Sequence, residues 1–249
     1  NKDKNLSGEQ VKFASTVHSA GQDLLALINE ILDLSKVEAG KMPVSPKAVP
    51  IKEVQEYLDQ TFRPVAEHKG LDFVITAKSN IPKTMFTDEN RLHQILKNLL
   101  SNAFKFTDKG QVQMSIERDR SSVIFRVTDT GIGIPLEKQK LIFEAFQQAD
   151  GTTSRKYGGT GLGLNISREI ARLLGGVIEV QSEPGKGSSF TLKLPLKYSG
   201  PDGIASAMQV EEMPDIKPGP TGADFTGRKI LIVDQDMRNV FALSSMLIN

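Results

Sequence analysis

The feature that most constrains this chain is a long apolar seam near its beginning. From Ser7 to about Glu38, apolar and small residues recur at alternating spacings of three and four, which predicts one long helix with a coiled-coil-like seam. Gly40 and the prolines after it are expected to end this helix. Because a single helix cannot bury such a face, it needs a partner helix or a second copy of the chain. The seam consists of Val11, Ala14, His18, Gly21, Leu25, Ile28 and Leu32, and a second row of Val17, Leu24 and Ile31 widens it.

The composition excludes several classes of function. A formal net charge of +1 indicates neither a nucleic-acid footprint nor a polybasic membrane patch. Since there is no cysteine, disulfides, thiolate catalysis and cysteine-ligated zinc are excluded. The three histidines, His18, His68 and His93, are far apart in sequence and suggest no shared metal site. No apolar run approaches the ~20 residues that span a bilayer, and nothing resembles a signal peptide, so we expect a cytoplasmic region.

A block with mixed strand and helix patterns follows at 43–196. Strands are predicted at 47–50, 71–77, 84–86, 111–118, 122–128, 176–182 and 189–195, and helices at 51–68, 88–105, 136–147 and 161–174. This order predicts an α+β fold, with a mixed, mainly antiparallel sheet and helices on one face.

The C-terminal part of the chain has a different character. Residues 197–227 carry several prolines and glycines with almost no periodicity, which is typical of a linker. Residues 228–249 contain a buried-strand pattern, an acidic turn and the start of a helix. Such a segment is too short to form a domain, so we expect the sequence to be cut from something longer.

The first of two glycine clusters is "DTGIGI" (129–134), at the end of a predicted strand. It matches neither the P-loop nor the dinucleotide fingerprint. Gly131 and Gly133 would let the backbone approach a flat ligand, and Asp129 could accept a hydrogen bond from an exocyclic amine such as that of adenine. An Asp-Gly turn that closes a hairpin explains the same hexamer.

The second cluster is "KYGGTGLGL" (156–164), which also matches neither fingerprint. Gly161 and Gly163 open a predicted helix, whose N-terminal amides and dipole suit a phosphate. A loop with Thr160 as an ordinary N-cap is the alternative.

The predicted helix 88–105 carries two amides on one face. Asn98 and Asn102 are four residues apart and lie among leucines and isoleucines. They suit a hydrated Mg²⁺, which takes oxygen ligands and usually keeps waters and substrate phosphates. Lys105, about one turn further, could reach a phosphate. A solvated amphipathic helix is the alternative explanation of this segment.

Taken in order, these segments resemble the N, G1, F and G2 boxes of the sensor histidine kinases, which belong to the GHKL ATP-binding superfamily. The four boxes are "HQILKNLLSNAFKFT" (93–107), "DTGIGI", "FEAFQQ" (143–148) and "GGTGLGL" (158–164). Three further segments are similar to parts of hybrid kinases: "LLALINEILDLSKVEAGKM" (24–42) to a hairpin helix, "GSSFTLKLP" (187–195) to the closing strand of the catalytic domain, and "ILIVDQDMRNVFAL" (230–243) to the opening of a receiver domain.

The resemblance implies a GHKL-type ATPase sandwich preceded by a dimerisation helix. Residues 1–42 would be the second helix of a dimerisation and phosphotransfer hairpin, and 43–196 the ATP-binding catalytic domain. Residues 197–227 would link it to the start of a receiver domain at 228–249. The receiver's usual pair of adjacent acids is broken here by Gln235, which puts its phosphorylation in doubt.

The resemblance also implies roles for single residues, with ATP and Mg²⁺ as cofactors. Asp129 would bind the adenine amine, with Gly131 and Gly133 shaping that pocket. Asn98 and Asn102 would hold Mg²⁺, and Lys105 the phosphates. Further implied roles are those of Phe143 and Phe146 as anchors of a lid at 148–160, and of Arg155, Lys156, Gly159, Thr160, Gly161, Leu162 and Gly163 at the triphosphate. The two phenylalanines could equally be core residues, and the two lid cations solvated charges.

The implied activity is that of an ATP-dependent protein histidine kinase within a two-component hybrid sensor kinase. Its partners would be ATP and ADP, a second copy of the chain through the hairpin helix, and a receiver domain or downstream phosphotransfer protein. None of the three histidines is followed by an acid as the family's phosphoacceptor is, so we expect the acceptor helix upstream of Asn1 and no autophosphorylation by this fragment.

The sequence is also compatible with different functions on the same nucleotide fold. ATP-hydrolysing relatives such as gyrase, MutL and the heat-shock chaperones carry a water-activating Glu near the start of the N box, whereas 96–102 contains no carboxylate. A serine kinase of the same superfamily and a nucleotide-binding regulatory pseudokinase both remain open.

Overall fold

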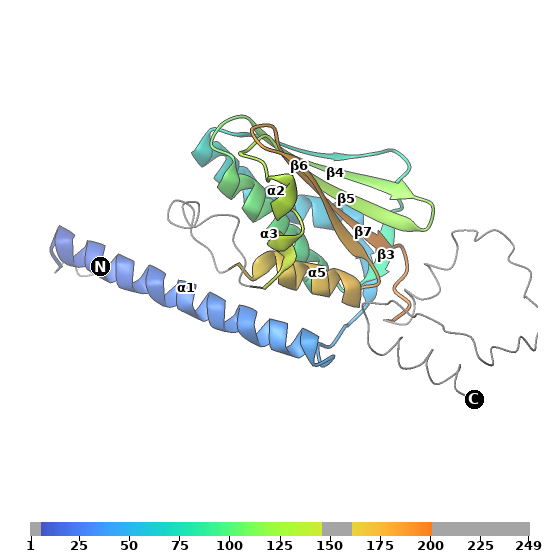
Figure 1. Cartoon of the computed structure of the whole chain (residues 1–249), viewed down its shortest axis with the longest axis horizontal. Helices are drawn as coiled ribbons and strands as arrows, with labels where there is room; N and C mark the ends of the chain where they lie inside the picture. Colours follow the sequence, from blue (N-terminus) through green and yellow to red (C-terminus); the bar gives the residue numbers. More distant parts are fainter. Residues whose placement is uncertain (1–5, 146–160, 201–249) are drawn as a thin grey trace, which may run out of the picture. The chain divides into compact units, whose positions relative to one another are not determined.

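The computed structural model describes residues 6–145 and 161–200. Within these ranges it contains one long helix followed by an α+β block (Figure 1). Most of the predicted linker, the predicted receiver segment 228–249 with Gln235, and the whole predicted lid 148–160 lie outside the described residues.

The long helix α1 (Gly8–Glu38) begins where its sequence predicts. The Ser7 side chain accepts a hydrogen bond from the Gln10 N–H, and the Gln10 side chain accepts one from the Ser7 N–H, which completes a capping box. The helix ends at Glu38 with Ala39 as its C-cap, and Gly40 follows in the left-handed conformation with φ of +64°. The predicted helix and the glycine that ends it are both confirmed.

The described part of the block contains two sheets. The strands are β1 (Lys47–Pro50), β2 (Asp72–Ala77), β3 (Thr84–Thr87), β4 (Gln111–Asp119), β5 (Ser122–Asp129), β6 (Val177–Glu183) and β7 (Gly187–Pro195). Strands β1 and β3 form an antiparallel pair, and the other five form a sheet in the order β2-β4-β5-β7-β6. Within this five-stranded sheet the β2–β4 pair is parallel and the remaining pairs are antiparallel, so the predicted mixed, mainly antiparallel sheet is confirmed.

Helices α2 (Ile51–Lys69), α3 (Glu89–Phe106) and α5 (Gly163–Leu173) cover one face of the five-stranded sheet (Figure 1). The core lies between these helices and the sheet. Its largest fully buried side chains include Leu58, Leu92, Ile95, Leu96, Leu99, Leu100, Met114, Ile116, Phe125 and Leu162.

Strand β5 lies at the centre of the sheet and alternates strictly between buried and half-buried residues. Val123, Phe125 and Val127 are fully buried, and Asp129 continues the same series. Because successive side chains of a strand point to opposite faces, the register that buries Phe125 under the helices also buries Asp129. The sequence pattern of β5 therefore places the Asp129 carboxylate on the buried face of the sheet.

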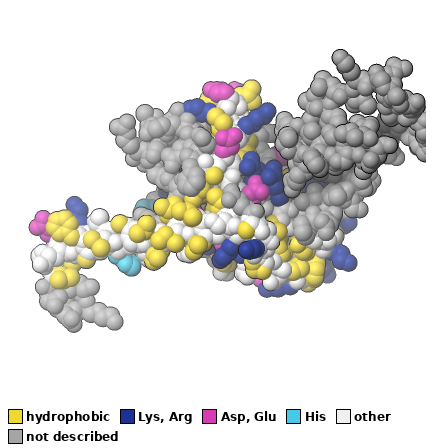
Figure 2. Space-filling model, turned by 60° about the horizontal axis from the view of Figure 1, so that its bottom comes forward, with side chains coloured by type: hydrophobic (Ala, Val, Ile, Leu, Met, Phe, Trp, Pro, Cys, Tyr) yellow, Lys and Arg dark blue, Asp and Glu magenta, His cyan; other side chains and the backbone are white. Residues whose placement is uncertain are grey.

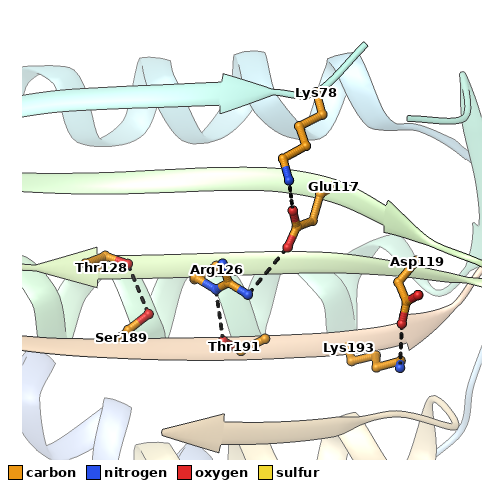
Figure 3. Close-up of polar contacts among 8 residues, drawn as sticks. All are labelled: Lys78, Glu117, Asp119, Arg126, Thr128, Ser189, Thr191 and Lys193. Carbon is orange, nitrogen blue, oxygen red and sulfur yellow. Dashed lines mark hydrogen bonds and ion pairs between the residues drawn. The ribbon is translucent and has the colours of Figure 1, made fainter. Parts of the chain in front are cut away.

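The opposite face of the sheet is polar and pairs its own charges (Figure 3). Glu117 on β4 accepts a hydrogen bond from the Lys78 ammonium, and its other oxygen lies 3.4 Å from the Arg126 guanidinium on β5. Two more cross-strand pairs are Thr128 with Ser189 at 3.1 Å and Asp119 with Lys193 at 2.9 Å. This face therefore neutralises its charges across strands β4, β5 and β7.

The predicted helix 136–147 is wrong over its described part. Two 3₁₀ turns, η1 (Leu136–Lys138) and η2 (Leu141–Phe143), stand in its place. The Gln139 side chain donates to the Ile134 carbonyl at 3.0 Å and to the Ser182 carbonyl at 2.8 Å. The bond to Ser182 ties the segment to β6, so its local periodicity does not develop into a continuous α-helix.

The apolar seam of α1 is open to solvent in the chain as described. Figure 2 shows hydrophobic side chains gathered along this helix. The exposed ones include Val11, Phe13, Val17, Leu24, Leu25, Ile28, Ile31 and Leu32, with Val17 72% exposed. Among the described residues, no helix combines the length and the apolar character that crossing a bilayer requires.

The C-terminal part of α1 contacts the α+β block. Leu34 is buried in the common core. The Asp33 carboxylate accepts a hydrogen bond from Gln94 Nε2 at 2.9 Å and lies 3.7 Å from the Arg91 guanidinium on α3. Both apolar and polar contacts therefore hold this end of the helix against the block.

We predict that Glu117→Gln lowers the free energy of unfolding by about 0.5–1 kcal/mol at pH 7, because it removes a carboxylate shared by two cations. The hydrogen bond from Lys78 holds the pKa of Glu117 below its usual value. This stabilisation is therefore complete above the unfolded-state pKa of roughly 4.3 and is lost as pH falls through the lowered native pKa. Urea unfolding at several pH values measures both effects.

The matched control is Asp119→Asn on the same face. Both side chains of the Asp119–Lys193 pair are 46% exposed, whereas the Glu117 side chain is 16% exposed, so the control should lose less stability. An equal loss for the two variants would contradict the importance we give to the Glu117 pairs.

Candidate functional site

Asp129 is a buried carboxylate at the end of the central strand. Its Oδ1 accepts the backbone N–H of Gly131 at 2.8 Å, and the backbone N–H of Ser188 on β7 also bonds to the carboxylate. Burial raises the pKa of Asp129 above its usual value, although both N–H groups act in the opposite direction. The protein therefore holds an acceptor in a fixed, poorly solvated position.

The glycines around Asp129 are required by contacts within the protein. A Cβ on Gly131 would lie 2.3 Å from the Phe106 carbonyl oxygen at the end of α3. Gly133 has a φ of +70°, and a Cβ there would lie 2.1 Å from the Glu183 carbonyl oxygen. The sequence prediction assigned both glycines to the approach of a flat ligand, whereas the structure fills the space of their missing side chains with backbone. Their role in shaping a ligand pocket stays a prediction.

The two amides predicted on α3 lie together, as their spacing indicates. Asn102 Nδ2 approaches Asn98 Oδ1 at 3.4 Å, a long hydrogen bond, and Asn98 Nδ2 donates to Ser167 Oγ on α5 at 2.8 Å. Lys105 follows in the last turn of α3, and burial lowers the pKa of its ammonium group. Its Nζ lies 5.2 Å from the centre of the Phe106 ring.

The second glycine cluster meets this pair of amides. Helix α5 begins at Gly163, two residues later than predicted, and its N-cap is Leu162, which forms no side-chain capping bond. The Leu162 side chain is fully buried, so only its backbone could face a ligand. A Cβ on Gly163 would lie 2.5 Å from Asn98 Oδ1, which places this oxygen beside the first turn of α5. Gly161 precedes the turn with a φ of +74°.

Phe143 lies in the core and is tied to α5. Its carbonyl accepts Asn165 Nδ2 at 2.9 Å, its ring packs edge-to-face against Phe190, and the Arg168 guanidinium lies 5.7 Å from the ring centre. The core assignment of Phe143 is thus confirmed, and its role as a lid anchor stays a prediction. The remaining predicted site residues, Phe146, Arg155, Lys156, Gly159 and Thr160, lie outside the described residues.

Helix α3 connects the two glycine clusters. Its middle presents Asn98 to the start of α5, and its C-terminal carbonyl at Phe106 accepts the Ile132 N–H at 3.3 Å from the first cluster. The structure therefore brings Asn98, Asn102 and Gly163 together and packs the Asp129 loop against the end of the same helix.

Sequence reasoning missed several residues of this arrangement. Ser167 bonds to Asn98, Asn165 bonds to the Phe143 carbonyl, and Ser188 bonds to Asp129. Gly187 has a φ of +106° and would place a Cβ 1.9 Å from the Asp129 carbonyl oxygen. A signal existed for Ser167 and Asn165, because both are polar residues beside isoleucines in an amphipathic helix and must find a partner if buried.

The residues present fit a magnesium–phosphate ligand better than a bare metal ion. No group of three or more His, Cys, Asp or Glu side chains within 6–145 and 161–200 could hold a metal. Two amide oxygens supply neutral ligands, which suit a Mg²⁺ ion that keeps waters and phosphate oxygens. The start of α5, without a side-chain cap, is suited to the phosphate itself.

The chain is similar to a known protein family and to several curated relatives. The family described as "Histidine kinase-, DNA gyrase B-, and HSP90-like ATPase" matches residues 87–198. The autoinducer 2 sensor kinase/phosphatase LuxQ of Vibrio parahaemolyticus is 35% identical over 98% of this chain and 28% of its own length. The signal transduction histidine-protein kinase BarA of Escherichia coli is 37% identical over 74% of this chain and 21% of its own length. The chain thus spans only a minor part of these curated relatives.

Solved structures share the fold. The crystal structure of full-length ShkA in complex with AMPPNP matches this chain with a TM-score of 0.70 and 31% sequence identity. The match covers 80% of this chain and 41% of ShkA. The catalytic domain of the histidine kinase ThkA in a nucleotide-free form has a TM-score of 0.54 and 26% identity, covering 61% of this chain and 99% of that domain. The predicted GHKL-type ATPase fold is therefore confirmed.

We predict that Asp129→Asn changes the pH dependence of stability without nucleotide. Because the native pKa of Asp129 is raised, its stabilising contribution is complete below the unfolded-state pKa of roughly 3.9 and is lost as pH rises through the native pKa. Asparagine does not ionise, so the unfolding free energy of the variant minus that of the wild type should increase as pH rises from about 4 to 7.

Urea unfolding of both proteins across this range checks the prediction. Asp119→Asn is the control. Its hydrogen bond to Lys193 lowers the pKa of Asp119, so the corresponding difference should stay nearly constant above about pH 5 and should change with the opposite sign as pH falls below this value. A constant difference for Asp129→Asn would show that burial does not disfavour its charge.

Proposed function

Residues 87–198 belong to the histidine kinase-, DNA gyrase B-, and HSP90-like ATPase family, and on that premise we propose that the chain binds Mg-ATP and transfers its γ-phosphoryl group to a protein histidine. The observation that carries this proposal is the contact of Asn98 with both Asn102 and the start of α5 at Gly163. This contact brings two amides that could bind a metal ion next to a helix N-terminus that could bind a phosphate. The activity of the whole protein is part of the same proposal.

Asp129 would receive the adenine. Its carboxylate is buried and fixed by the N–H groups of Gly131 and Ser188, and a carboxylate has lone pairs for further donors such as an exocyclic amine. Gly131 and Gly133 would form the wall of that pocket. The complex of ShkA with AMPPNP, an ATP analogue bound to a protein of the same fold, supports a nucleotide as the ligand of this chain.

Asn98 and Asn102 would hold Mg²⁺, and Lys105 would approach the phosphates. When bound, Mg²⁺ neutralises charge on the phosphate oxygens. The backbone at Gly161, Leu162 and Gly163 would donate to the same oxygens. Phe143 and Phe146 as lid anchors, and Arg155, Lys156, Gly159 and Thr160 at the triphosphate, belong to the proposal by resemblance to the family's boxes.

In the transfer step a ring nitrogen of the acceptor histidine bonds to the γ-phosphorus while the bond to the bridging oxygen of ADP breaks. The proton on the other ring nitrogen passes to solvent. Catalysis would come from positioning and from charge neutralisation by the fixed groups of this chain. Since residues 96–102 contain no carboxylate to activate water, we favour transfer over hydrolysis.

The acceptor histidine would lie outside this sequence, on the first helix of a hairpin whose second helix is α1. A receiver domain or downstream phosphotransfer protein would then take the phosphoryl group from it. The exposed seam of α1, with Val17 and Leu25 among its members, would dimerise. The division into 1–42, 43–196, 197–227 and 228–249 is likewise part of this proposal.

We predict that Asp129→Asn weakens ATP binding by roughly 10- to 100-fold, because it turns part of a charged acceptor into a donor that opposes the adenine amine. Calorimetric titration with ATP and Mg²⁺ measures the affinity. Asp119→Asn, on the opposite face of the sheet, should bind as the wild type does. An unchanged affinity for Asp129→Asn would remove Asp129 from the nucleotide site.

A second experiment tests the transfer. We mix the chain with Mg²⁺, γ-labelled ATP and a separate protein that carries both hairpin helices with a histidine followed by an acid. Acid-labile label should appear on that protein and not on this chain, and it should be absent when the acceptor histidine is replaced by glutamine. If ATP binds while the acceptor stays unlabelled, a regulatory pseudokinase is the better interpretation. Label on this chain would identify His18, His68 or His93 as an acceptor.

A further inference from the structure

Ser167 is a buried hydroxyl that contacts the candidate site through another side chain. It lies on α5, one turn after Gly163, and is 2% exposed. Its Oγ accepts a hydrogen bond from Asn98 Nδ2 at 2.8 Å. The neighbouring positions Ile166 and Ile170 pack into the core, so an alanine at 167 would serve the packing equally well. The hydroxyl therefore needs an explanation beyond filling space.

This contact determines the orientation of the Asn98 amide. Because the nitrogen end is bonded to Ser167, the oxygen end lies on the other side. There Asn98 Oδ1 accepts the long bond from Asn102 at 3.4 Å and lies against Gly163 at the first turn of α5. The oxygen therefore points to the place where a cation and phosphate would bind.

The opposite orientation of the amide would be unfavourable at this place. It would present the nitrogen to Asn102 Nδ2 and to the N–H groups at the first turn of α5, so that donors would face donors. It would also require the Ser167 hydroxyl to donate where it now accepts. Ser167 and the helix start thus select the same orientation of Asn98.

We propose that Ser167 is a positioning residue that holds the Asn98 amide with its oxygen toward the metal. This inference rests on the proposed Mg-ATP site and adds that the two amides have different roles in it. Asn98 is the fixed ligand, bonded at its nitrogen by Ser167, whereas Asn102 is held by the long bond to Asn98 and adjusts to the bound ion.

The test measures binding of Mn²⁺, a spectroscopic substitute for Mg²⁺, by electron paramagnetic resonance in the presence of ATP. Ser167→Ala should lower the affinity for Mn²⁺ by about 10-fold, the lower end of the range for groups that orient metal ligands. Ser167→Thr restores the hydroxyl and should recover most of the affinity. Ser101→Ala, an exposed serine on α3, is the control and should bind Mn²⁺ as the wild type does.

A second background separates positioning from a structural role. Asn98→Asp has two equivalent oxygens, so its orientation no longer matters. In that background, Ser167→Ala should change Mn²⁺ affinity by less than about twofold, because the two residues are coupled. A merely structural serine would cause the same loss in both backgrounds, and that result would overturn the proposal.

The remaining outcomes are also decisive. Wild-type affinity in Ser167→Ala, with ATP and Mn²⁺ bound by the wild type, would refute the role of Ser167 and leave the proposed function intact. Absence of ATP binding by the folded wild type would refute both. If circular dichroism shows Ser167→Ala unfolded, Ser167→Cys replaces it, since its sulfur is a weaker acceptor of similar size and should give a smaller loss.

Discussion

The alternation of side chains along β5 is the constraint on which the rest of the structure depends. This strand is hydrogen-bonded on both sides, to β4 and to β7, and its buried face carries Val123, Phe125 and Val127. The hydrophobic gain from these side chains fixes the register, since a slip by one residue would expose all of them. The same register carries Asp129 inside, opposite Ser188 of β7, whose N–H bonds to its carboxylate. Burial of the apolar side chains of β5 thus also fixes the position of Asp129, whose charge would be costly to bury without these partners.

Helix α3 connects the core to the candidate functional site. Its apolar residues pack beneath the sheet, while the face with Asn98 and Asn102 meets α5. Its end receives the backbone of Gly131 so closely that no side chain could stand there, and its middle meets Gly163 in the same way. Both glycine clusters are therefore needed for contact with one helix. A ligand between them would meet groups whose positions were already fixed during folding, which reduces the reorganisation that binding costs.

The sequence alone was sufficient for the parts of the structure that depend on local pattern. Period-two and period-3.6 alternation placed most of the strands and helices within a few residues. Asn98 stood out because a polar residue on an apolar face needs a reason, and Asp129 stood out because it precedes a glycine cluster at the end of a strand. It was insufficient where the reason lies in another element. The partner of Asn98 is Ser167, which is far away in sequence, and the carbonyl against Gly133 comes from Glu183. The predicted helix 136–147 failed for the same reason, since the bonds of Gln139 to the chain around it override the local pattern.

Two surfaces of the chain differ in what they leave unsatisfied, and the difference indicates which of them is better suited to the proposed association. On the outer face of the sheet, Glu117 is shared by Lys78 and Arg126, so that this face needs no partner to neutralise its charges (Figure 3). Along α1, by contrast, many leucine, isoleucine and valine side chains are exposed to water (Figure 2). Apolar surface of that length is costly to expose, and its helical spacing is complementary to another helix of the same kind. A second helix of matching seam, whether from another copy of the chain or from an adjoining hairpin, would therefore gain more by packing on α1 than on any part of the sheet face.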